Sequence, residues 1–88
     1  MYTVYVLLSK STGKQYIGQT QDLTRRLTEH EQGIARYTRN RGPWELVHHE
    51  ILKTRAEAMK RERFLKSGQG REWLKGRLSG RAGPPQAD

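Results

Sequence analysis

The first segment of the chain is typical of a β-strand. Residues 2–9 are mostly β-branched, aromatic or aliphatic. In a strand, alternate side chains point to opposite faces, so Val4 and Val6 would share one face, and Tyr5 and Leu7 the other. Residues 11–14 have turn composition, and residues 15–19 form a second short strand. The chain therefore begins with an antiparallel hairpin.

The rest of the chain predicts three helices and one more strand. We expect a helix at residues 22–31, ended by Gly33, with an apolar stripe of Leu23, Leu27 and Ile34. A third strand follows Pro43 at residues 44–52, and Thr54-x-x-Glu57 is a capping box that opens a second helix at about residues 55–66. A short third helix at residues 71–78 would dock through Trp73, Leu74 and Leu78. The predicted fold class is α+β, with a small three-stranded, mostly antiparallel sheet flanked by helices in the order β-β-α-β-α-α.

The length of the chain limits its organisation. Its 88 residues, 33% of them hydrophobic, allow one domain with one modest core and leave no room for a large cofactor. We predict a single domain at residues 1–78. Residues 79–88 are rich in Gly, Pro and small side chains, and we predict a disordered C-terminal tail there.

The charge balance favours a polyanionic partner. Lys and Arg number 17 against 9 acidic residues, a formal net charge of +8, and they are spread over the chain rather than gathered in one tail. Nucleic acid and an anionic membrane face are both candidates, and the alternative is that the excess only aids solubility. No cysteine, membrane-spanning run or signal peptide is seen, which predicts a cytoplasmic protein. Of the two polyanions, we expect nucleic acid rather than a membrane to be the partner.

Glu62 interrupts the apolar stripe predicted for the second helix. It lies four residues after Ala58 and three before Leu65, and Met59 belongs to the same predicted stripe. An ionised carboxylate that faces a core is costly unless a cation neutralises it. That cation is either a neighbouring Lys or Arg or a bound metal ion, and the spacing alone favours neither.

Two more features resist a purely structural explanation. Arg26 and His30, four residues apart, share one face of the first predicted helix, although a His there is more often a hydrogen-bonded core residue than a catalyst. Tyr5 and Tyr16 occupy paired strands, where tyrosines usually pack. Gly18 weakens its strand unless another group approaches the backbone closely.

Together these side chains have the chemistry needed to act on a phosphodiester. An Arg neutralises phosphate oxygens in a forked geometry, and a carboxylate holds Mg²⁺ or Mn²⁺ while leaving room for water and phosphate. A tyrosine takes a proton from water only if nearby positive charge lowers its pKa from about 10.

The order of these motifs resembles the GIY-YIG nuclease family. Residues 3–5 read Thr-Val-Tyr where the family has Gly-Ile-Tyr, whereas residues 16–18 keep Tyr-Ile-Gly intact. Arg26 and His30 follow in an Arg-Arg-x-x-x-His pattern, and residues 57–62 resemble the helix that carries the family's metal-binding glutamate. The likeness spans about residues 2–78. It is strongest to small stand-alone bacterial members, which are related to the excision-repair nuclease with the same domain.

The resemblance implies the fold predicted above and one-metal hydrolysis of a nucleic-acid backbone. By position, Glu62 would hold one divalent ion, Mg²⁺ or Mn²⁺, Arg26 would bind the scissile phosphate, and His30 would assist in the same pocket. Either Tyr5 or Tyr16 would activate the attacking water. Some relatives have a Lys where this chain has Gln19, so the general base is the least defined of these roles.

Three functions follow as alternatives. The first is a metal-dependent endonuclease that acts on DNA in preference to RNA, with a structure-specific, repair-related substrate or a partner protein that selects the target. The second is a non-catalytic DNA- or RNA-binding module of the same fold, and the third a basic protein-interaction domain. Arginines interleaved with aromatic residues suit phosphate contact and base stacking. The candidate nucleic-acid-binding residues are Arg25, Arg36, Arg39, Arg41, Lys53 and Arg55.

Overall fold

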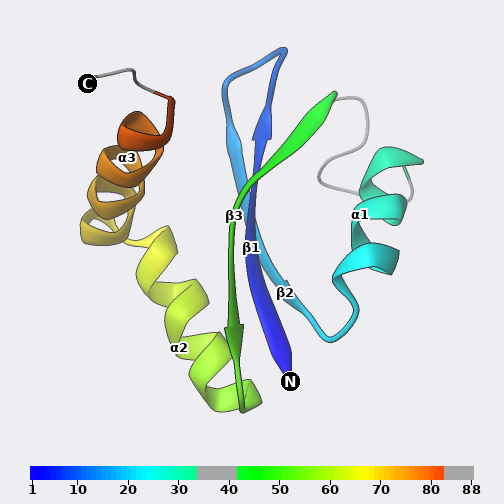
Figure 1. Cartoon of the computed structure of the whole chain (residues 1–88), viewed down its shortest axis with the longest axis vertical. Helices are drawn as coiled ribbons and strands as arrows, with labels where there is room; N and C mark the ends of the chain where they lie inside the picture. The colour runs from blue at the N-terminus through cyan, green and yellow to red at the C-terminus, as the bar shows by residue number, and fades with distance from the viewer. Residues whose placement is uncertain (34–41, 83–88) are drawn as a thin grey trace.

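The computed structural model describes residues 1–33 and 42–82, with side chains to residue 78. Three strands and three helices follow the chain in the predicted order (Figure 1). The elements are β1 (Tyr2–Ser9), β2 (Gln15–Thr20), α1 (Leu23–Glu31), β3 (Trp44–Leu52), α2 (Arg55–Lys66) and α3 (Gly68–Ala82). The α+β fold class and the order β-β-α-β-α-α are therefore confirmed, and Ile34 lies outside the described residues.

The sheet is antiparallel throughout and has β1 at its centre, in the order β2-β1-β3. Tyr5 is paired with Gly18 of β2 on one side and with His49 of β3 on the other. Between Val6 and Leu7 the register to β3 shifts, and this bulge leaves Val47 opposite no residue of β1. Val47 joins the buried core.

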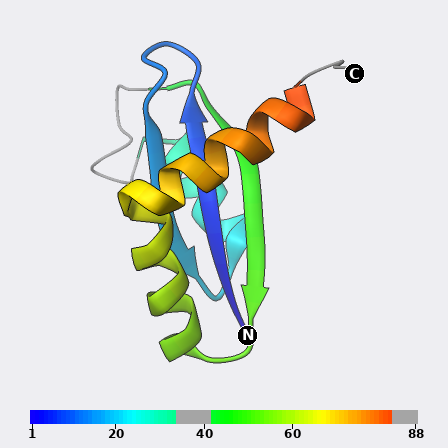
Figure 2. The same ribbon diagram turned by 90° about the vertical axis from the view of Figure 1, so that its left-hand side faces the viewer.

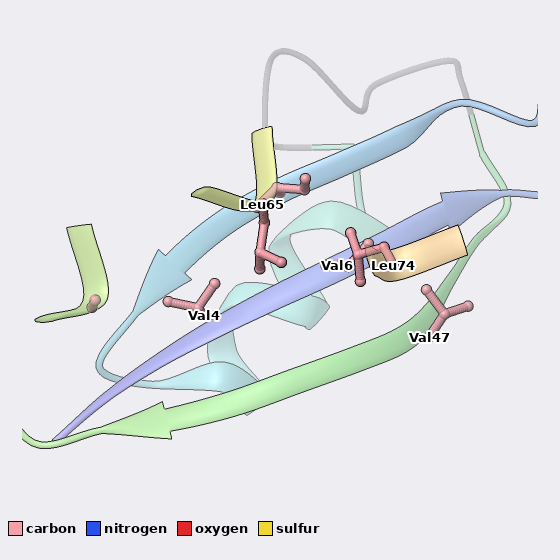
Figure 3. Close-up of a cluster of buried hydrophobic side chains, with 7 residues drawn as sticks. Val4, Val6, Val47, Leu65 and Leu74 are labelled. Carbon is pink, nitrogen blue, oxygen red and sulfur yellow. The ribbon is translucent and has the colours of Figure 1, made fainter. Parts of the chain in front are cut away.

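Helices cover both faces of the sheet, because the central strand is buried on both sides. Val4 and Val6 are fully buried against α2 and α3, where Leu65 and Leu74 pack on them (Figure 3). Tyr5 and Leu7 are equally buried on the opposite face, toward α1. The two views show α1 on one side of the sheet and α2 with α3 on the other (Figures 1 and 2).

The predicted helix signals are present as side-chain caps. The carboxylate of Asp22 accepts a hydrogen bond from the Arg25 amide, and Thr54 and Glu57 make both hydrogen bonds of the capping box. Gly33 follows α1 with a φ of +76°, which glycine adopts without a steric penalty. These caps account for where α1 ends and where α1 and α2 begin.

The bounds predicted for the third helix were wrong. We expected residues 71–78, whereas α3 runs from Gly68 to Ala82, so it includes the first four residues of the predicted tail. Ser67 starts α3, because its side chain accepts a hydrogen bond from the Gly70 amide. A Cβ at Gly70 would overlap the Phe64 carbonyl, so this glycine permits close packing of α3 on α2 rather than ending a helix. Residues 83–88 lie outside the described residues, and the domain boundary stays a prediction.

Two predicted core positions are on the surface. Met59 is 42% exposed, so it does not belong to the buried stripe of α2, which consists of Ala58 and Leu65. Trp73 is 37% exposed, and its ring lies beneath the Arg61 guanidinium, 4.7 Å from the centroid. Its ring also packs edge-on against His48 of β3, so the prediction that the third helix docks through Trp73 is confirmed, although the ring stays partly exposed. Among the described residues, no helix combines the length and the apolar character needed to cross a bilayer.

Arg61 also fastens α2 to the edge strand β3. Its guanidinium donates two hydrogen bonds to the Glu50 carboxylate, with N–O distances of 2.8 and 3.0 Å, and His48 Nε2 lies 2.7 Å from the same carboxylate. Burial acts to raise the pKa of Glu50, but the hydrogen bonds from Arg61 and His48 outweigh it and hold this pKa below its ordinary value. These three side chains link α2 to β3, at the edge of the sheet opposite β2.

Candidate active site

Tyr5 lies at the centre of the polar cluster between the sheet and α1. Its side chain leaves the middle of β1 and is fully buried. Its hydroxyl is 3.0 Å from Nε2 of His30. Burial raises the pKa of Tyr5 to about 12, with a smaller contribution from Tyr16, while Arg26 acts in the opposite direction. Tyr5 is therefore a protonated phenol over the whole physiological range.

His30 closes the cluster from the last turn of α1. It is 4% exposed, and its ring packs edge-on against both tyrosines, with centroids 5.8 Å from Tyr5 and 5.0 Å from Tyr16. Burial lowers the pKa of His30 below 6.5, and the charge of Arg26 lowers it further, although Glu29 opposes the shift. The imidazole is therefore neutral at pH 7.

Gly18 explains how the two tyrosines come together. It lies directly across from Tyr5 in the hairpin, and a Cβ there would fall 2.9 Å from the Tyr5 hydroxyl and 3.0 Å from a ring carbon of Tyr16. The sequence predicted that another group approaches this glycine closely, and that group is the pair of phenol rings. Their centroids are 6.1 Å apart.

Arg26 brings positive charge to both phenols from the first half of α1. Its guanidinium donates a 2.8 Å hydrogen bond to Glu29, which is the main reason that the pKa of Arg26 is raised, and interactions with Tyr5 and Tyr16 raise it further. The same hydrogen bond lowers the pKa of Glu29. Arg26 is therefore a permanent cation held beside the tyrosines.

Glu62 lies on α2, so it approaches the sheet from the face opposite α1. The Gln19 side-chain amide donates to one oxygen of Glu62 at 3.1 Å, and the Lys66 ammonium lies 2.7 Å from the other. Of the two cations that the sequence left open for Glu62, a neighbouring Lys and a metal ion, the Lys is thus present beside the carboxylate. An open hollow of about 300 Å³ lies over Gln19, Glu62 and Lys66.

The surroundings of Glu62 fit a weakly held, water-rich divalent ion. Mg²⁺ keeps several waters and is commonly bound through one or two carboxylates together with substrate phosphates. The described residues contain no group of three or more His, Asp or Glu side chains that would form a closed metal site. The Glu62 carboxylate is 20% exposed and faces an open hollow. It would meet the needs of a water-rich ion held by one carboxylate if the Lys66 ammonium moved away from it.

Comparison with known proteins agrees with these motifs. Residues 1–75 match the sequence model of the GIY-YIG catalytic domain. The chain belongs to the GIY-YIG family. GIY-YIG domains form a nuclease superfamily whose members generally depend on a divalent metal, and their substrate is nucleic acid.

Curated relatives of similar length carry the name UPF0213. A UPF0213 protein of Halobacterium salinarum is 45% identical over 67 residues, which cover 75% of this chain and 86% of the relative. One from Staphylococcus saprophyticus is 36% identical over 73 residues, covering 82% and 88%. The solution NMR structure of a UPF0213 protein from Bacillus halodurans aligns with a TM-score of 0.54 at 37% identity, covering 98% of this chain and 90% of that one. Both sequence and fold thus match small GIY-YIG proteins.

The predicted nucleic-acid-binding residues are scattered over this GIY-YIG domain. Arg25 is on the surface of α1, where Asp22 and Glu29 pair with it. Lys53 and Arg55 are exposed at the start of α2. Arg36, Arg39 and Arg41 lie outside the described residues. Of the described members, Arg25 thus neighbours the Arg26 of the cluster on α1, while Lys53 and Arg55 lie at the start of α2.

Three residues at the site were not singled out from the sequence. Glu29 pairs with Arg25 at 3.3 Å, as their i,i+4 spacing allows, but it makes its shorter contact, 2.8 Å, with Arg26. Gln19 was noted only for lacking charge, yet its amide contacts Glu62. Lys66 follows Glu62 at the i,i+4 spacing of helix ion pairs, a signal that was available.

Proposed function

We propose that this chain is a divalent-metal-dependent endonuclease that hydrolyses phosphodiester bonds in nucleic acid, with DNA preferred over RNA. The observation that supports this most is the cluster around Gly18, where two phenols, a neutral imidazole and a permanent guanidinium meet. Tertiary packing alone does not require four polar side chains at one glycine. Membership of a nuclease family supplies the reaction class.

Arg26 is the group proposed to bind the scissile phosphate. Its guanidinium lies beside both phenols, and charge-assisted hydrogen bonds from Arg to phosphate are strong and often bidentate. Glu29 already holds it through one nitrogen, Nη1. We propose that Glu29 acts as a positioning residue, which fixes the guanidinium while its remaining N–H groups face the phosphate.

Tyr16 is the better candidate for the general base. Tyr5 is fully buried, its pKa is raised to about 12, and its hydroxyl is engaged with His30. Tyr16 is only half-buried, and it is among the residues that line an open pocket at the β2 edge. We propose that Tyr16, once its hydroxyl proton has passed to bulk water, takes the proton of the attacking water with the Arg26 cation beside the phenolate. Tyr5 and His30 fix the ring packing around it.

Glu62 is proposed to hold the metal, either Mg²⁺ or Mn²⁺. When bound, such an ion supplies Lewis-acid polarisation of the phosphate and stabilises the leaving oxygen. Gln19 orients the Glu62 carboxylate from β2, the strand that also carries Tyr16. The proposed site therefore spans the β2 edge, with the metal ligand on one face of the strand and the phenols on the other.

One observation favours a second candidate, a nucleic-acid-binding module without catalysis. In this structure both oxygens of Glu62 have partners in Gln19 and Lys66, and Arg26 is paired with Glu29. If these pairs persist with substrate, the fold keeps a basic surface but holds no metal. Binding without turnover at any metal concentration would identify that case.

All six described elements belong to the sheet or to the helices packed on it. We propose that the substrate is recognised by shape, as a flap, a nick or a single strand in DNA repair, or that a partner protein selects it. The lack of cysteine in the chain suits a reducing cytoplasmic setting.

The experiment that tests this function compares purified Glu62→Gln with the wild type. The wild type is expected to nick branched, nicked and single-stranded DNA only with Mg²⁺ or Mn²⁺, while Glu62→Gln loses nicking but retains DNA binding. Glu72→Gln, which removes an exposed carboxylate from α3, is the matched control and should cut normally. Cutting that survives chelator or Glu62→Gln would refute the assignment.

A further inference from the structure

An open pocket of about 590 Å³ lies at the β2 edge, next to the proposed catalytic cluster. Tyr16 is among the residues that line it, so the pocket adjoins the strand that carries the proposed general base. Three cations line it from three different elements: Lys14 precedes β2, Lys66 ends α2 and Arg71 belongs to the first turns of α3. Residues far apart in sequence thus place positive charge in one hollow.

The charge of this pocket is not balanced from within. No Asp or Glu lines it, and α3 has no acidic residue in its first turn. Lys66 is paired with Glu62 at its border, at 2.7 Å. Lys14 and Arg71 have no ion pair within the part of the chain that the structure describes.

Among the described residues, some cations are neutralised by ion pairs and others, such as Lys10 and Lys75, make none, so what distinguishes Lys14 and Arg71 is that they line one hollow. Arg25 and Arg26 are paired with Glu29, and Arg61 is paired with Glu50. Uncompensated like charges around a concave surface repel one another and focus the positive potential into the hollow. An anion in the pocket would relieve that repulsion, and the peptide dipoles at the start of α3 favour the same sign of ligand.

We infer that this pocket binds the sugar–phosphate backbone of nucleic acid next to the scissile phosphate, through Lys14, Lys66 and Arg71. The inference rests on the proposed function for the identity of the anion, because Tyr16 is shared between pocket and cluster. The inference assigns backbone contacts to three residues that are not among the nucleic-acid-binding residues predicted from the sequence. The strand would run along the β2 edge, from Arg26 on the α1 face toward the junction of α2 and α3.

The test measures the salt dependence of binding in chelator, so that cutting plays no part. A labelled single-stranded DNA and its RNA counterpart are titrated by fluorescence anisotropy at several salt concentrations. Lys14→Gln with Arg71→Gln should weaken binding and reduce the slope of log Kd against log salt by about 1.4, since each phosphate contact in a single strand contributes about 0.7. The DNA and RNA arms should change alike, because the pocket contacts phosphate in both.

A second double variant, Lys10→Gln with Lys75→Gln, removes the same charge from exposed positions of the same turn and the same helix. It should leave the slope unchanged. An equal loss in both doubles, or no loss in the first, would overturn the inference. Thermal unfolding confirms that each variant is folded, and Lys14→Arg with Arg71→Lys should restore the slope.

The outcomes separate this inference from the proposed function. A slope change specific to the pocket, in a protein that never cuts, supports the pocket and rejects the endonuclease. Metal-dependent cutting with an unaffected slope supports the endonuclease and rejects the pocket. Capture by anionic lipid vesicles with no oligonucleotide binding rejects both.

Discussion

The side-chain amide of Gln19 donates a 3.1 Å hydrogen bond to the carboxylate of Glu62. Gln19 directly follows Gly18, the residue over which Tyr5 and Tyr16 meet. Through this contact the strand that carries one tyrosine also orients the carboxylate on α2, although the tyrosine cluster and the carboxylate lie on opposite faces of the sheet. The two halves of the proposed site are thus joined across a single edge strand.

Tyr16→Phe should lower the rate of metal-dependent cutting by about 10²–10⁴-fold, because it removes the proposed general base. Tyr5→Phe should reduce cutting less and instead lower the free energy of unfolding by about 1 kcal/mol, since it removes the buried contact with His30. Single-turnover cutting and thermal unfolding measure the two effects. The reverse ranking of the two variants in cutting would transfer the role to Tyr5.

Lys66→Gln should raise the affinity of Glu62 for Mn²⁺ about fivefold, because the ammonium competes with the metal for the carboxylate. The factor corresponds to about 1 kcal/mol, the upper end of what a solvent-screened ion pair contributes. Titration followed by electron paramagnetic resonance measures free Mn²⁺ directly. Lys60→Gln, on the exposed side of the same helix, is the control. Equal Mn²⁺ affinities for the wild type and both variants would show that the Lys66 ammonium does not compete with the ion for the Glu62 carboxylate.

His30 should make stability depend on pH in the neutral range. Its pKa is lower in the folded protein than the ordinary 6.5, so below pH 6.5 the unfolded chain takes up a proton that the folded protein does not. The stabilisation that the neutral His30 imidazole contributes above pH 6.5 is therefore lost as the pH falls toward the pKa of His30 in the folded protein. Tyr5, Tyr16, Arg26 and Glu29 face the ring, and side chains of these types ordinarily titrate outside this window.

His30→Gln, which still offers Tyr5 a polar partner, should remove this dependence below about pH 6.5. Glu50 and Glu29 have lowered pKa values, so their contributions are lost only below about pH 4.5, in the variant and the wild type alike. Chemical denaturation at a series of pH values distinguishes the two windows. A wild type whose stability rises from pH 7 to pH 5.5 would contradict the neutral, buried imidazole.

Two glycines of α3 should respond to alanine in opposite ways. At Gly70 a Cβ would overlap the Phe64 carbonyl and lie 2.6 Å from Leu65 Cα, so Gly70→Ala should destabilise by about 1–3 kcal/mol. At Gly76 no atom lies within 4 Å of that position, and Gly76→Ala should stabilise by about 0.5–1 kcal/mol through helix propensity. Melting temperatures give the ranking, and equal shifts would show that α3 does not pack on α2 as described.

Local signals in the sequence were sufficient for the strands and for the start of α2. The capping box at Thr54 and the alternation of residues 2–9 act over a few residues, so the sequence alone reveals them. Gly18 was also informative, because a glycine inside a strand points to a close approach. The tertiary structure then supplied what the sequence lacked, the identity of the approaching group.

The errors came from contacts between elements. The predicted third helix began at residue 71, whereas Gly70 lies inside α3 and packs against α2, where the Phe64 carbonyl leaves no space for a side chain. Met59 was assigned to the buried stripe from spacing alone, whereas the packing of α2 leaves it exposed. For Glu62 the sequence left metal and Lys equally open, and Lys66 is its neighbour in this structure.

The most direct test of the central claim is a crystal of the Tyr16→Phe variant grown with Mn²⁺ and a short single-stranded DNA. The proposed function predicts an anomalous peak about 2.1 Å from a Glu62 carboxylate oxygen, with Lys66 displaced from that oxygen. It also predicts a phosphate between the ion and the Arg26 guanidinium. An ion bound elsewhere, or Glu62 still paired with Lys66 and no phosphate beside Arg26, would contradict the endonuclease site.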